Sequence, residues 1–302
     1  MVPPVSPVLV RIGFLEIHWY GVLIMIGVLL GAVYAARQAP RRGIAPDHIW
    51  NGLVVCVFLG IIGARLYHVF STPAGCTADA GYACGWPWYR HHPEDIVKIW
   101  TGGLGIYGAI VGGILGVIVY ARYNHLSILD LLDLGAPGLA LGQALGRWGN
   151  FINQELYGPP TGSTWYGLRI DAAHRLPIYR DLPADTLFHP TFLYESLWCL
   201  ALFVLLVVLA RRLAPRLRAG DIFAGYVIGY PLGRFWIELF RPDAWRIGPF
   251  ATAQWVALIL IAAGVVFIVL RHRRATPPVA GEPPQEAGEV AGEPAGSGPA
   301  TE

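Results

Sequence analysis

Residues 252–270 read TAQWVALILIAAGVVFIVL and contain no Asp, Glu, Lys or Arg. Roughly 20 mainly apolar residues are needed for a helix to cross the hydrocarbon core of a bilayer. This stretch is therefore typical of a membrane-spanning helix. Earlier stretches share its length and apolar character, so the sequence predicts an all-α integral membrane protein with seven spans: 19–37, 50–70, 103–121, 129–147, 190–210, 221–240 and 252–270.

The composition of the whole chain supports a membrane protein of several spans. Hydrophobic residues make up 55% of the 302 residues and charged residues only 14%, whereas about 25% of a soluble domain is usually charged. The net charge of +2 says little about partners, and we expect no nucleic-acid partner. The first residues lack the basic segment and the cleavage site of a signal peptide, so we predict no cleaved leader.

The distribution of arginines predicts the orientation of the spans. Cytoplasmic loops of membrane proteins carry an excess of Lys and Arg. The segments after the first, third, fifth and seventh predicted spans are the basic ones, and they contain Arg37, Arg41, Arg42, Arg122, Arg211, Arg212, Arg216, Arg218, Arg271, Arg273 and Arg274. We therefore place the N-terminus outside and the C-terminus in the cytoplasm.

The loops on the predicted outer side are long, at about 71–101 and 148–189. The second is rich in Trp, Tyr, Gly and Pro, and we expect it to form a small periplasmic head. Residues 1–274 are thus predicted to form one seven-helix membrane domain. Residues 275–302 are rich in Pro, Gly, Ala and Glu and contain no aromatic residue. They predict a disordered acidic tail that is dispensable for catalysis.

The four cysteines fall into two groups. Cys56 and Cys199 lie within apolar spans, where they are typical packing residues. Cys76 and Cys84 lie in a polar loop with seven residues between them. A disulfide fits there if the loop is extracytoplasmic, but the spacing alone does not establish one. No C-x-x-C motif or His/Cys cluster indicates a metal site.

Residues 145–158, LGRWGNFINQELYG, place polar side chains at the end of the fourth apolar span. A charged side chain in a span costs at least a few kcal/mol, so its presence needs a reason. An Arg near a helix end can simply reach interfacial water, but that does not explain the polar residues around it. We predict a binding site here. The segment contains no Cys, Ser or His to act as a nucleophile; its polar residues are Arg147, Asn150, Asn153, Gln154 and Glu155.

A second polar pattern lies in residues 225–241, GYVIGYPLGRFWIELFR. Tyr230, Arg234 and Glu238 recur every fourth residue and so share one face of a helix. An Arg–Glu pair that holds helices together would explain the pattern. Arg, however, keeps its charge in a low dielectric and binds phosphate through several donors. Because Arg234 and Glu238 cancel, we expect Arg147 to supply the net positive charge of an anion site.

The third span begins WTGGLGIYGAIVGGILG, and its glycines suit close helix–helix packing. Tyr107 would then lie in a crowded, glycine-lined place. Tyr20, in the first span, is either an interfacial anchor or a hydroxyl of the site. Asp130 and Asp133 flank the start of the fourth span, and we interpret them mainly as helix-start charges.

Six motifs, in order along the chain, carry a resemblance to a known family: HWYG, GARLYHVF, WTGGLGIYGAIVGG, GRWGNFINQELYG, FHPTFLYES and GYPLGRFWIELFRPD. The chain resembles the bacterial prolipoprotein diacylglyceryl transferases over roughly residues 15–270. The fourth motif is a long and highly specific signature, whereas the glycine-rich motif alone would be weak.

The resemblance implies an enzyme of lipoprotein biosynthesis. It implies transfer of the sn-1,2-diacylglyceryl group from phosphatidylglycerol to the lipobox cysteine thiol of a prolipoprotein signal peptide. The products are a thioether-linked prolipoprotein and glycerol 1-phosphate. A seven-helix bundle in the bacterial cytoplasmic (inner) membrane, surrounded by membrane lipids, with a periplasmic head and no metal or organic cofactor, is also implied. The absent nucleophile then has an explanation, because the reacting thiol belongs to the substrate.

The family's signature can be placed on this sequence residue by residue. Its arginine, which binds the lipid head group, falls on Arg147. Its asparagine and glutamate fall on Asn150 and Glu155, and its closing glycine falls on Gly158. The resemblance therefore predicts that Arg147, Asn150 and Gly158 bind the lipid and that Arg147 and Glu155 take part in catalysis.

The other motifs add residues from the first, third and sixth spans. The tyrosine, arginine and glutamate of the sixth span fall on Tyr230, Arg234 and Glu238, and the tyrosine of the first motif falls on Tyr20. Many family members carry a histidine in the third-span motif, often regarded as the catalytic base. This chain has Tyr107 there, and a tyrosine with an unperturbed pKa of about 10 is a poor base near neutral pH.

A mechanism can be written from these residues. The acceptor thiolate attacks the glycerol carbon that bears phosphate, and a phosphate monoester leaves. We expect Arg147 and Arg234 to stabilise charge on the departing phosphate. Glu155 and Glu238 either orient these arginines or take the thiol proton.

The remaining roles are binding of the head group and acceptance of the proton. We expect Asn150, Asn153 and Tyr20 to position the head group. Either the base lies elsewhere, or Tyr107 serves through a hydrogen bond. His68 and His189 are the other candidate bases.

Two other classes of protein compete with this interpretation. A transporter would place ionisable groups through the full depth of the membrane and often contains internal repeats. We find no clear repeat, and Arg65, Arg147 and Arg234 all approach the predicted outer half. Another phospholipid-modifying enzyme, such as a phosphatase or acyltransferase, would usually need a Ser, His or metal-binding Asp constellation, and none is evident.

Overall fold

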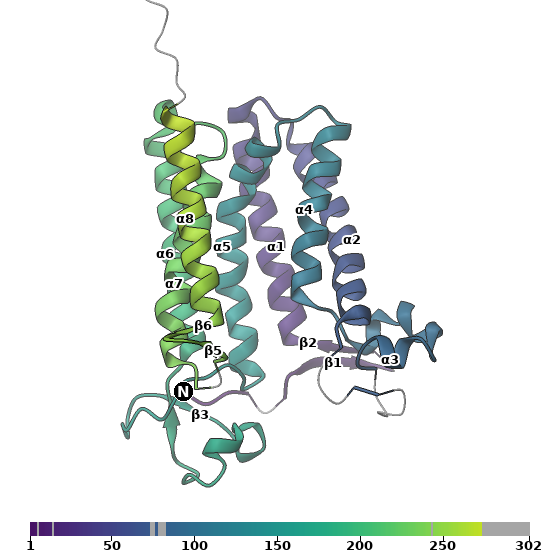
Figure 1. The fold of residues 1–302 in the computed structure, drawn as a ribbon, viewed down its shortest axis with the longest axis vertical. Helices are drawn as coiled ribbons and strands as arrows, with labels where there is room; N and C mark the ends of the chain where they lie inside the picture. Colours follow the sequence, from purple (N-terminus) through teal and green to yellow (C-terminus); the bar gives the residue numbers. More distant parts are fainter. Residues whose placement is uncertain (5, 14, 73–75, 78–82, 243, 274–302) are drawn as a thin grey trace, which may run out of the picture.

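A computed structural model describes residues 1–4, 6–13, 15–72, 76–77, 83–242 and 244–273. Long helices run side by side, and most of the short elements gather at one end of them (Figure 1). The long helices are α1 (Trp19–Gln38), α2 (Pro46–Phe70), α4 (Ile106–Tyr123), α5 (Ile128–Ile152), α6 (Thr191–Arg212), α7 (Asp221–Ile237) and α8 (Thr252–Arg273).

The short elements were not predicted. Three antiparallel strand pairs are present: β1 (Val8–Ile12) with β2 (Leu15–His18), β3 (Leu168–Arg169) with β4 (Leu187–Phe188), and β5 (Arg246–Ile247) with β6 (Phe250–Ala251). One short helix is α3 (Trp86–Tyr89). The 3-10 turns are η1 (Ala39–Arg42), η2 (Pro93–Val97), η3 (Ile99–Thr101), η4 (Ala172–His174), η5 (Pro177–Tyr179), η6 (Ala214–Arg216) and η7 (Glu238–Phe240).

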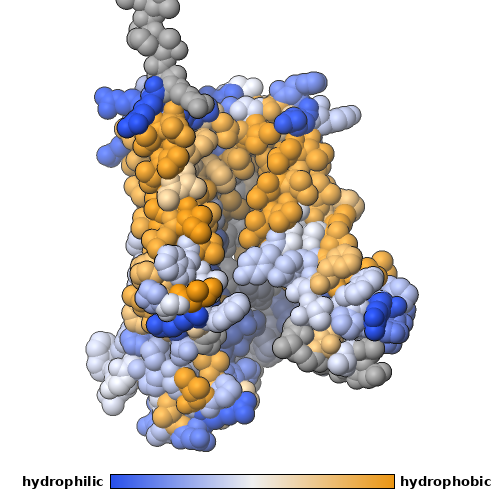
Figure 2. Space-filling view, in the orientation of Figure 1, coloured by the Kyte–Doolittle hydropathy of each residue, from blue (hydrophilic) through white to orange (hydrophobic). Residues whose placement is uncertain are grey.

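Within the described residues, six helices are long and apolar enough to cross a membrane: the helical segment Trp19–Arg42, α2, α4, α5, α6 and α8. Helix α7 has 17 residues and is the shortest of the long helices. Figure 2 shows a band of hydrophobic side chains around the middle of the bundle, with hydrophilic residues gathered at both ends. Large apolar side chains of α2, such as Val54 and Phe58, are exposed. The chain is therefore a multi-pass membrane protein.

Close backbone contacts at glycines hold two helix pairs together. A Cβ added to Gly108 of α4 would lie 2.0 Å from the carbonyl oxygen of Gly63 in α2, and one added to Gly112 would meet Leu59 in the same helix. The expectation that third-span glycines serve packing is confirmed at these positions. Between α1 and α5, a Cβ on Gly31 would lie 2.9 Å from Cα of Gly138. Side chains at either interface would force the helices apart.

The fourth span ends later than predicted. Helix α5 continues to Ile152 rather than to residue 147, so Arg147 and Asn150 lie within the helix. The helix ends where Gln154 adopts a left-handed backbone, with φ 55°, and the amide of Glu155 donates to the carbonyl of Asn150 (3.0 Å). This geometry is a usual way to close a helix C-terminus.

Asp133 has a different role from the one predicted. It lies beyond the first turn of α5, is buried, and accepts hydrogen bonds from the backbone amides of Gly220 (2.9 Å) and Phe223 (2.8 Å) at the start of α7. It also pairs with Arg42 (2.9 Å), which binds Asp130 as well. The interpretation of Asp133 as a charge at the start of its own helix was wrong, because its carboxylate caps a neighbouring helix.

The segment between α5 and α6 forms a small head with its own core. Buried Tyr157, Leu168, Ile170 and Phe188 pack together there. The head also holds the start of the chain, because the ammonium group of Met1 donates to the carbonyl of Gly167 (2.8 Å). The N-terminus and the far end of α8 lie at opposite ends of the bundle (Figure 1).

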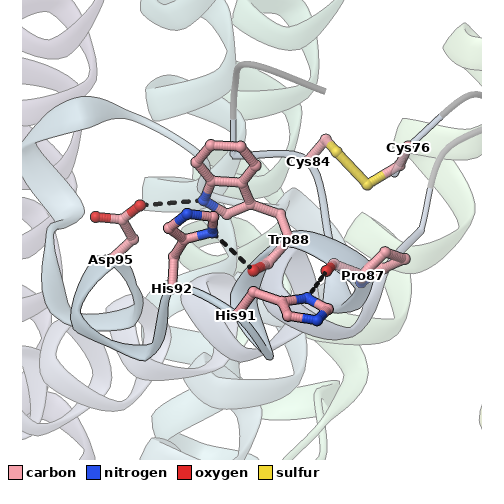
Figure 3. The surroundings of a disulfide bond; sticks show 7 residues. All are labelled: Cys76, Cys84, Pro87, Trp88, His91, His92 and Asp95. Atoms are coloured by element: carbon pink, nitrogen blue, oxygen red, sulfur yellow. Dashed lines mark hydrogen bonds between the residues drawn. A yellow bond between two sulfur atoms is a disulfide. The ribbon is translucent and has the colours of Figure 1, made fainter. Parts of the chain in front are cut away.

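The loop between α2 and α4 is organised by a disulfide and a buried arginine. Cys76 and Cys84 are joined, with Cα atoms 5.7 Å apart, beside the Trp88 and His92 rings (Figure 3). The pairing that the spacing left open is therefore present. Arg65 of α2 is buried and donates to backbone carbonyls of this loop. Its acceptors are the carbonyl oxygens of Asp95, Ile96, Lys98, Gly102 and Gly103.

The predicted acidic tail, residues 275–302, lies outside the described residues.

Candidate active site

Four charged side chains meet where α5, α6 and α7 approach the head. Arg147 comes from α5, Glu195 from α6 and Arg234 from α7, and Glu238 begins the turn η7. One carboxylate oxygen of Glu195 pairs with Nε of Arg147, and the other pairs with Nη1 of Arg234. The Nη2 of Arg234 pairs with Glu238 (2.5 Å). The structure thus brings together the arginines of two separate sequence motifs.

The predicted polar face of α7 is confirmed. Arg234 and Glu238 lie on it as an ion pair four residues apart. Tyr230, one turn earlier, faces both Arg147 and Arg234, and its ring stacks on Tyr226 with centroids 5.9 Å apart. The face is buried against α5 and α6, so these polar groups are shared between helices.

Helices α6 and α7 approach closely because a glycine allows it. A Cβ on Gly233 would lie 2.1 Å from the indole nitrogen of Trp198 in α6. That nitrogen donates to the carbonyl of Gly229 (2.9 Å). This contact sits beside Arg234 and less than one turn beyond Glu195, so it sets the distance across which their side chains pair.

The signature motif forms a chain of hydrogen bonds that begins at Arg147. Its Nη1 donates to Oδ1 of Asn150 (3.2 Å), and Nδ2 of Asn150 donates to Glu155 (2.8 Å). The amide of Asn153 donates to the same oxygen of Glu155 (3.3 Å). Asn150 is buried, whereas Glu155 is exposed. The motif therefore links the ion-pair cluster to the surface beside the head.

Tyr20 packs directly on this motif. A Cβ on Gly149 would lie 2.0 Å from Cδ2 of the Tyr20 ring. The glycine thus lets the first turn of α1 lie against the turn of α5 that carries Asn150. This packing favours the interpretation of Tyr20 as part of the site over its interpretation as an interfacial anchor.

Gly158 lies at a crowded joint between the head and two helices. Its amide donates to the carbonyl of His189 (2.9 Å). A Cβ there would lie 2.8 Å from Cβ of His189 and 3.1 Å from the carbonyl oxygen of Phe240. The glycine therefore holds the end of the signature against the turn that contains Glu238.

The charge of the cluster differs from the expectation. Arg147 was expected to leave a net positive charge beside the Arg234–Glu238 pair. Glu195 engages both arginines instead, so the two guanidiniums face two carboxylates. The fractional exposure of the Arg147 and Arg234 side chains is 20% and 17%. Both arginines thus remain accessible, but neither is without a counterion.

Glu195 was missed from the sequence. It stands in FHPTFLYES, one turn into the apolar fifth span, and it is buried. A charged side chain inside an apolar span costs free energy, so the presence of Glu195 needs a reason just as that of Arg147 does. That signal was present, but its two partners lie 48 and 39 residues away, and only the fold brings them together.

Tyr107 does not join the cluster. It lies in the first turn of α4, is 65% exposed, and packs on Tyr67 of α2 with ring centroids 5.5 Å apart. The expectation of a crowded place was wrong, because Gly105 and Gly108 pack against α2 while Tyr107 points outward. Among the described contacts of Tyr107, none reaches Arg147 or Arg234.

The two histidines proposed as alternative bases are both engaged in packing. His68 lies on α2 against Tyr89, with ring centroids 5.9 Å apart, and beside Gly103. His189 lies closer to the cluster, near the Phe240 ring, and its Nδ1 is 3.0 Å from the Tyr194 hydroxyl. Neither ring is hydrogen-bonded to the charged cluster among the described residues.

A cavity of about 290 Å³ lies beside the signature motif on the head side. Its lining includes Asn153 and Gln154 from the motif, and His18 and His174 from the first hairpin and the head. The lining is part polar and part apolar, and it carries no carboxylate or guanidinium. Among the residues that the structure describes, no three His, Cys, Asp or Glu side chains lie close enough together to hold a metal ion.

Comparison with known proteins gives a consistent result. A family model described as prolipoprotein diacylglyceryl transferase matches residues 7–270. The chain is 42% identical to the phosphatidylglycerol–prolipoprotein diacylglyceryl transferase of Chloroflexus aggregans, covering 93% of this chain and 94% of the relative. Proteins of the same name from Nostoc sp. and Streptococcus equi subsp. zooepidemicus are 43% and 37% identical, each covering 89% of this chain and 91% and 96% of the relative.

Proposed function

The chain belongs to the prolipoprotein diacylglyceryl transferase family, and on that premise we propose that it transfers the sn-1,2-diacylglyceryl group of phosphatidylglycerol to the lipobox cysteine of a prolipoprotein. The observation that carries the proposal is the pair of partly exposed guanidiniums, Arg147 and Arg234, held side by side by Glu195. Two fixed arginines in a site of low dielectric suit one phosphate group.

The membrane arrangement proposed is seven spans with the N-terminus outside. Helix α7 would rise about 26 Å at 1.5 Å per residue, close to the hydrocarbon thickness of a bilayer. An odd number of crossings agrees with Figure 1, in which the chain starts at one end of the helical bundle and α8 finishes at the other. The head would lie in the periplasm and the enzyme in the bacterial inner membrane, where prolipoprotein signal peptides are held.

In the proposed reaction the lipobox thiolate attacks the glycerol carbon that carries phosphate. A sulfur–carbon bond forms, the carbon–oxygen bond breaks, and the phosphate leaves as glycerol 1-phosphate. Arg147 and Arg234 stabilise the second negative charge that develops on this phosphate. Glu238 orients Arg234, and Glu155 orients Asn150 beside Arg147.

Neutral groups around the arginines would position the lipid head group. Asn150 and Asn153 offer amides, and Tyr20 and Tyr230 offer hydroxyls next to the same helices. Gly158 would keep these groups in place, because a glycine at this position allows the head to approach η7. Fixed neutral donors bind an uncharged glycerol without attracting a second charged group.

Tyr107 would take part as a hydrogen-bond donor rather than as a base. Its exposed position beside Tyr67 leaves the hydroxyl available to substrate, and a phenol hydroxyl can donate a hydrogen bond. Replacing Tyr107 with Phe is expected to reduce transfer only in part. Complete loss in a folded Tyr107→Phe protein would instead assign essential chemistry to the hydroxyl.

The proposal is tested by transfer of labelled diacylglyceryl from phosphatidylglycerol vesicles to a lipobox peptide. Arg147→Ala and Arg234→Ala should each reduce the rate by about 100-fold or more, the usual cost of removing one charge-stabilising group. Arg122→Ala, an exposed arginine at the other end of the bundle, is the matched control and should transfer normally. Near-normal transfer in either site variant, or no thioether from the unchanged protein, would contradict the proposal. The same assay distinguishes the proposed transferase from a transporter or another phospholipid-modifying enzyme, since neither of these would form the thioether.

A further inference from the structure

Glu195 occupies the position that the substrate phosphate needs. Its two carboxylate oxygens pair with Arg147 and with Arg234, and its side chain is only 9% exposed. Among the described residues it is the only carboxylate that engages both arginines. A phosphate that binds both guanidiniums from the side of Glu195 would take the two donors that Glu195 holds, Nε of Arg147 and Nη1 of Arg234.

The second carboxylate of the cluster is placed differently. Glu238 pairs with Arg234 (2.5 Å) from the same helical face and lies 3.8 Å from Arg241. It keeps these partners when a phosphate arrives from the side of Arg147. Phosphate binding therefore displaces Glu195 and leaves Glu238 in place.

We propose, resting on the transfer reaction above, that the carboxylate of Glu195 is exchanged for the substrate phosphate and then accepts the proton of the acceptor thiol. The thiol loses its proton to Glu195, its sulfur forms the bond to the glycerol carbon, and the carbon–oxygen bond electrons leave with the phosphate. The proton ends on the Glu195 carboxyl group, so atoms and charge balance. Binding of the lipid thereby creates the base that the next step requires.

The physical reason is the change in the surroundings of Glu195. Two adjacent guanidiniums stabilise the charged carboxylate, whereas a buried carboxylate without its counterions favours the proton. A thiol with a pKa of about 8.5 needs only a modest base. Glu195 is thus inactive as a base while it holds the arginines and becomes active once phosphate replaces it.

The other candidate bases are placed less well for this step. Tyr107 and His68 lie on the α2–α4 pair, and Nδ1 of His189 is taken by Tyr194. Glu155 is exposed and accepts hydrogen bonds from two asparagine amides. None of these side chains contacts both phosphate-binding arginines, so lipid binding would not change their charge environment as it changes that of Glu195.

Glu195→Gln tests the exchange, because the amide retains the size of the side chain but neither competes as an anion nor accepts the proton. Phosphatidylglycerol in nanodiscs of neutral lipid should bind the variant several-fold more tightly than the unchanged protein, measured without acceptor. Transfer to the peptide at pH 7 should fall by about 100-fold or more, the usual contribution of a general base. A purely structural role would not produce tighter binding together with slower turnover.

The pH profile supplies a second readout. Without a base, the Glu195→Gln variant depends on thiolate already present, so its rate should rise about tenfold per pH unit from pH 6 to pH 8. The unchanged protein should show a much flatter profile over this range. Asp133→Asn, which also removes a buried carboxylate paired with an arginine, is the control; it should change protein yield but neither lipid affinity nor the pH profile.

Three outcomes would overturn the inference. One is lipid binding by Glu195→Gln that is unchanged or weaker. Another is turnover within a few-fold of normal at pH 7, and the third is a rate that falls equally at every pH in a folded variant. Absence of transfer by the unchanged protein would instead refute the proposed function itself, which separates the two failures.

Discussion

At the scale of single residues, the site depends on positions where no side chain fits. Gly149 is the clearest example, because a Cβ there would lie 2.0 Å from the Tyr20 ring. A Cβ on Gly146, one turn earlier on the same helix, would have Cγ1 of Ile24 as its nearest neighbour, at 3.8 Å. The two glycines share a motif, but only one is needed for close contact.

Gly149→Ala is therefore expected to displace Tyr20 and to reduce diacylglyceryl transfer at least tenfold while the protein still folds. Gly146→Ala, the matched control, should retain transfer and gain about 0.5–1 kcal/mol of helix stability, since Ala is the better helix former. Transfer assays with both variants and with Tyr20→Ala decide the point. If the effect acts through Tyr20, the Gly149 and Tyr20 changes will not add; equal rates in the two glycine variants would refute it.

At the scale of elements, α2 and α4 form a pair whose spacing is set by backbone contact. The Cβ of an alanine at position 108 would lie 2.0 Å from the carbonyl oxygen of Gly63, and a backbone oxygen cannot rotate away. A Cβ added to Gly113, on another face of α4, would meet no other part of the described chain within 4 Å.

Gly108→Ala should lower the free energy of unfolding by about 1–3 kcal/mol, the usual cost of overpacking. Gly113→Ala should leave it unchanged or slightly higher. Thermal unfolding of both variants in the same detergent measures the difference. An equal melting temperature for the two would show that α2 and α4 separate at little cost.

The loop between α2 and α4 depends on a charged contact outside the long helices. The carboxylate of Asp95 accepts hydrogen bonds from Lys98 (2.7 Å) and from the Trp88 indole (3.0 Å) (Figure 3). The Lys98 hydrogen bond, followed by the Trp88 hydrogen bond, lowers the pKa of Asp95 below its usual range.

The sign of the pH effect follows from this lowered pKa. A carboxyl group whose pKa is lower in the folded state stabilises that state above its unfolded pKa of about 3.9. The stabilisation is lost as the pH falls through the lower, folded value. Acidification from pH 5 to pH 2 should therefore loosen the loop and change Trp fluorescence, and Asp95→Asn should remove this transition. A transition of the same size in Asp95→Asn would exclude Asp95 as its cause.

At the scale of the whole molecule, the polar cluster lies at one end of an apolar bundle, next to the head. The head, the loop between α2 and α4 and the N-terminal hairpin lie at that end, and the arginine-rich turns lie at the other (Figures 1 and 2). This arrangement suits a site that opens to one leaflet. It also makes the orientation of the bundle decisive for which leaflet supplies the lipid.

The proposed orientation predicts which engineered cysteines react with an impermeant reagent. Ser163→Cys in the head should be labelled in intact spheroplasts, whereas Arg216→Cys in η6 should be labelled only after the membrane is opened. Arg216 is exposed and Ser163 is half-buried, while the native free thiols are half-buried at Cys56 and buried at Cys199. Labelling of Arg216→Cys in intact cells would reverse the orientation.

The sequence by itself determined the membrane class, most helix positions and the arginines of the site. These follow from local patterns: apolar length, the four-residue spacing of Tyr230, Arg234 and Glu238, and the signature around Arg147. Local patterns have a local physical cause, so they can be recognised in the sequence without knowledge of the fold. The end of α5 was misplaced because polar residues continued the helix where they were expected to end it.

Only the tertiary structure decided how distant residues combine. Glu195 between Arg147 and Arg234, Asp133 as the cap of α7, and the outward position of Tyr107 each depend on contacts between separate helices. The charge of a site is a sum over every helix that faces it, and one motif contains only part of that sum. For this reason the sequence predicted a cationic site, whereas in the folded chain the carboxylate of Glu195 offsets that charge.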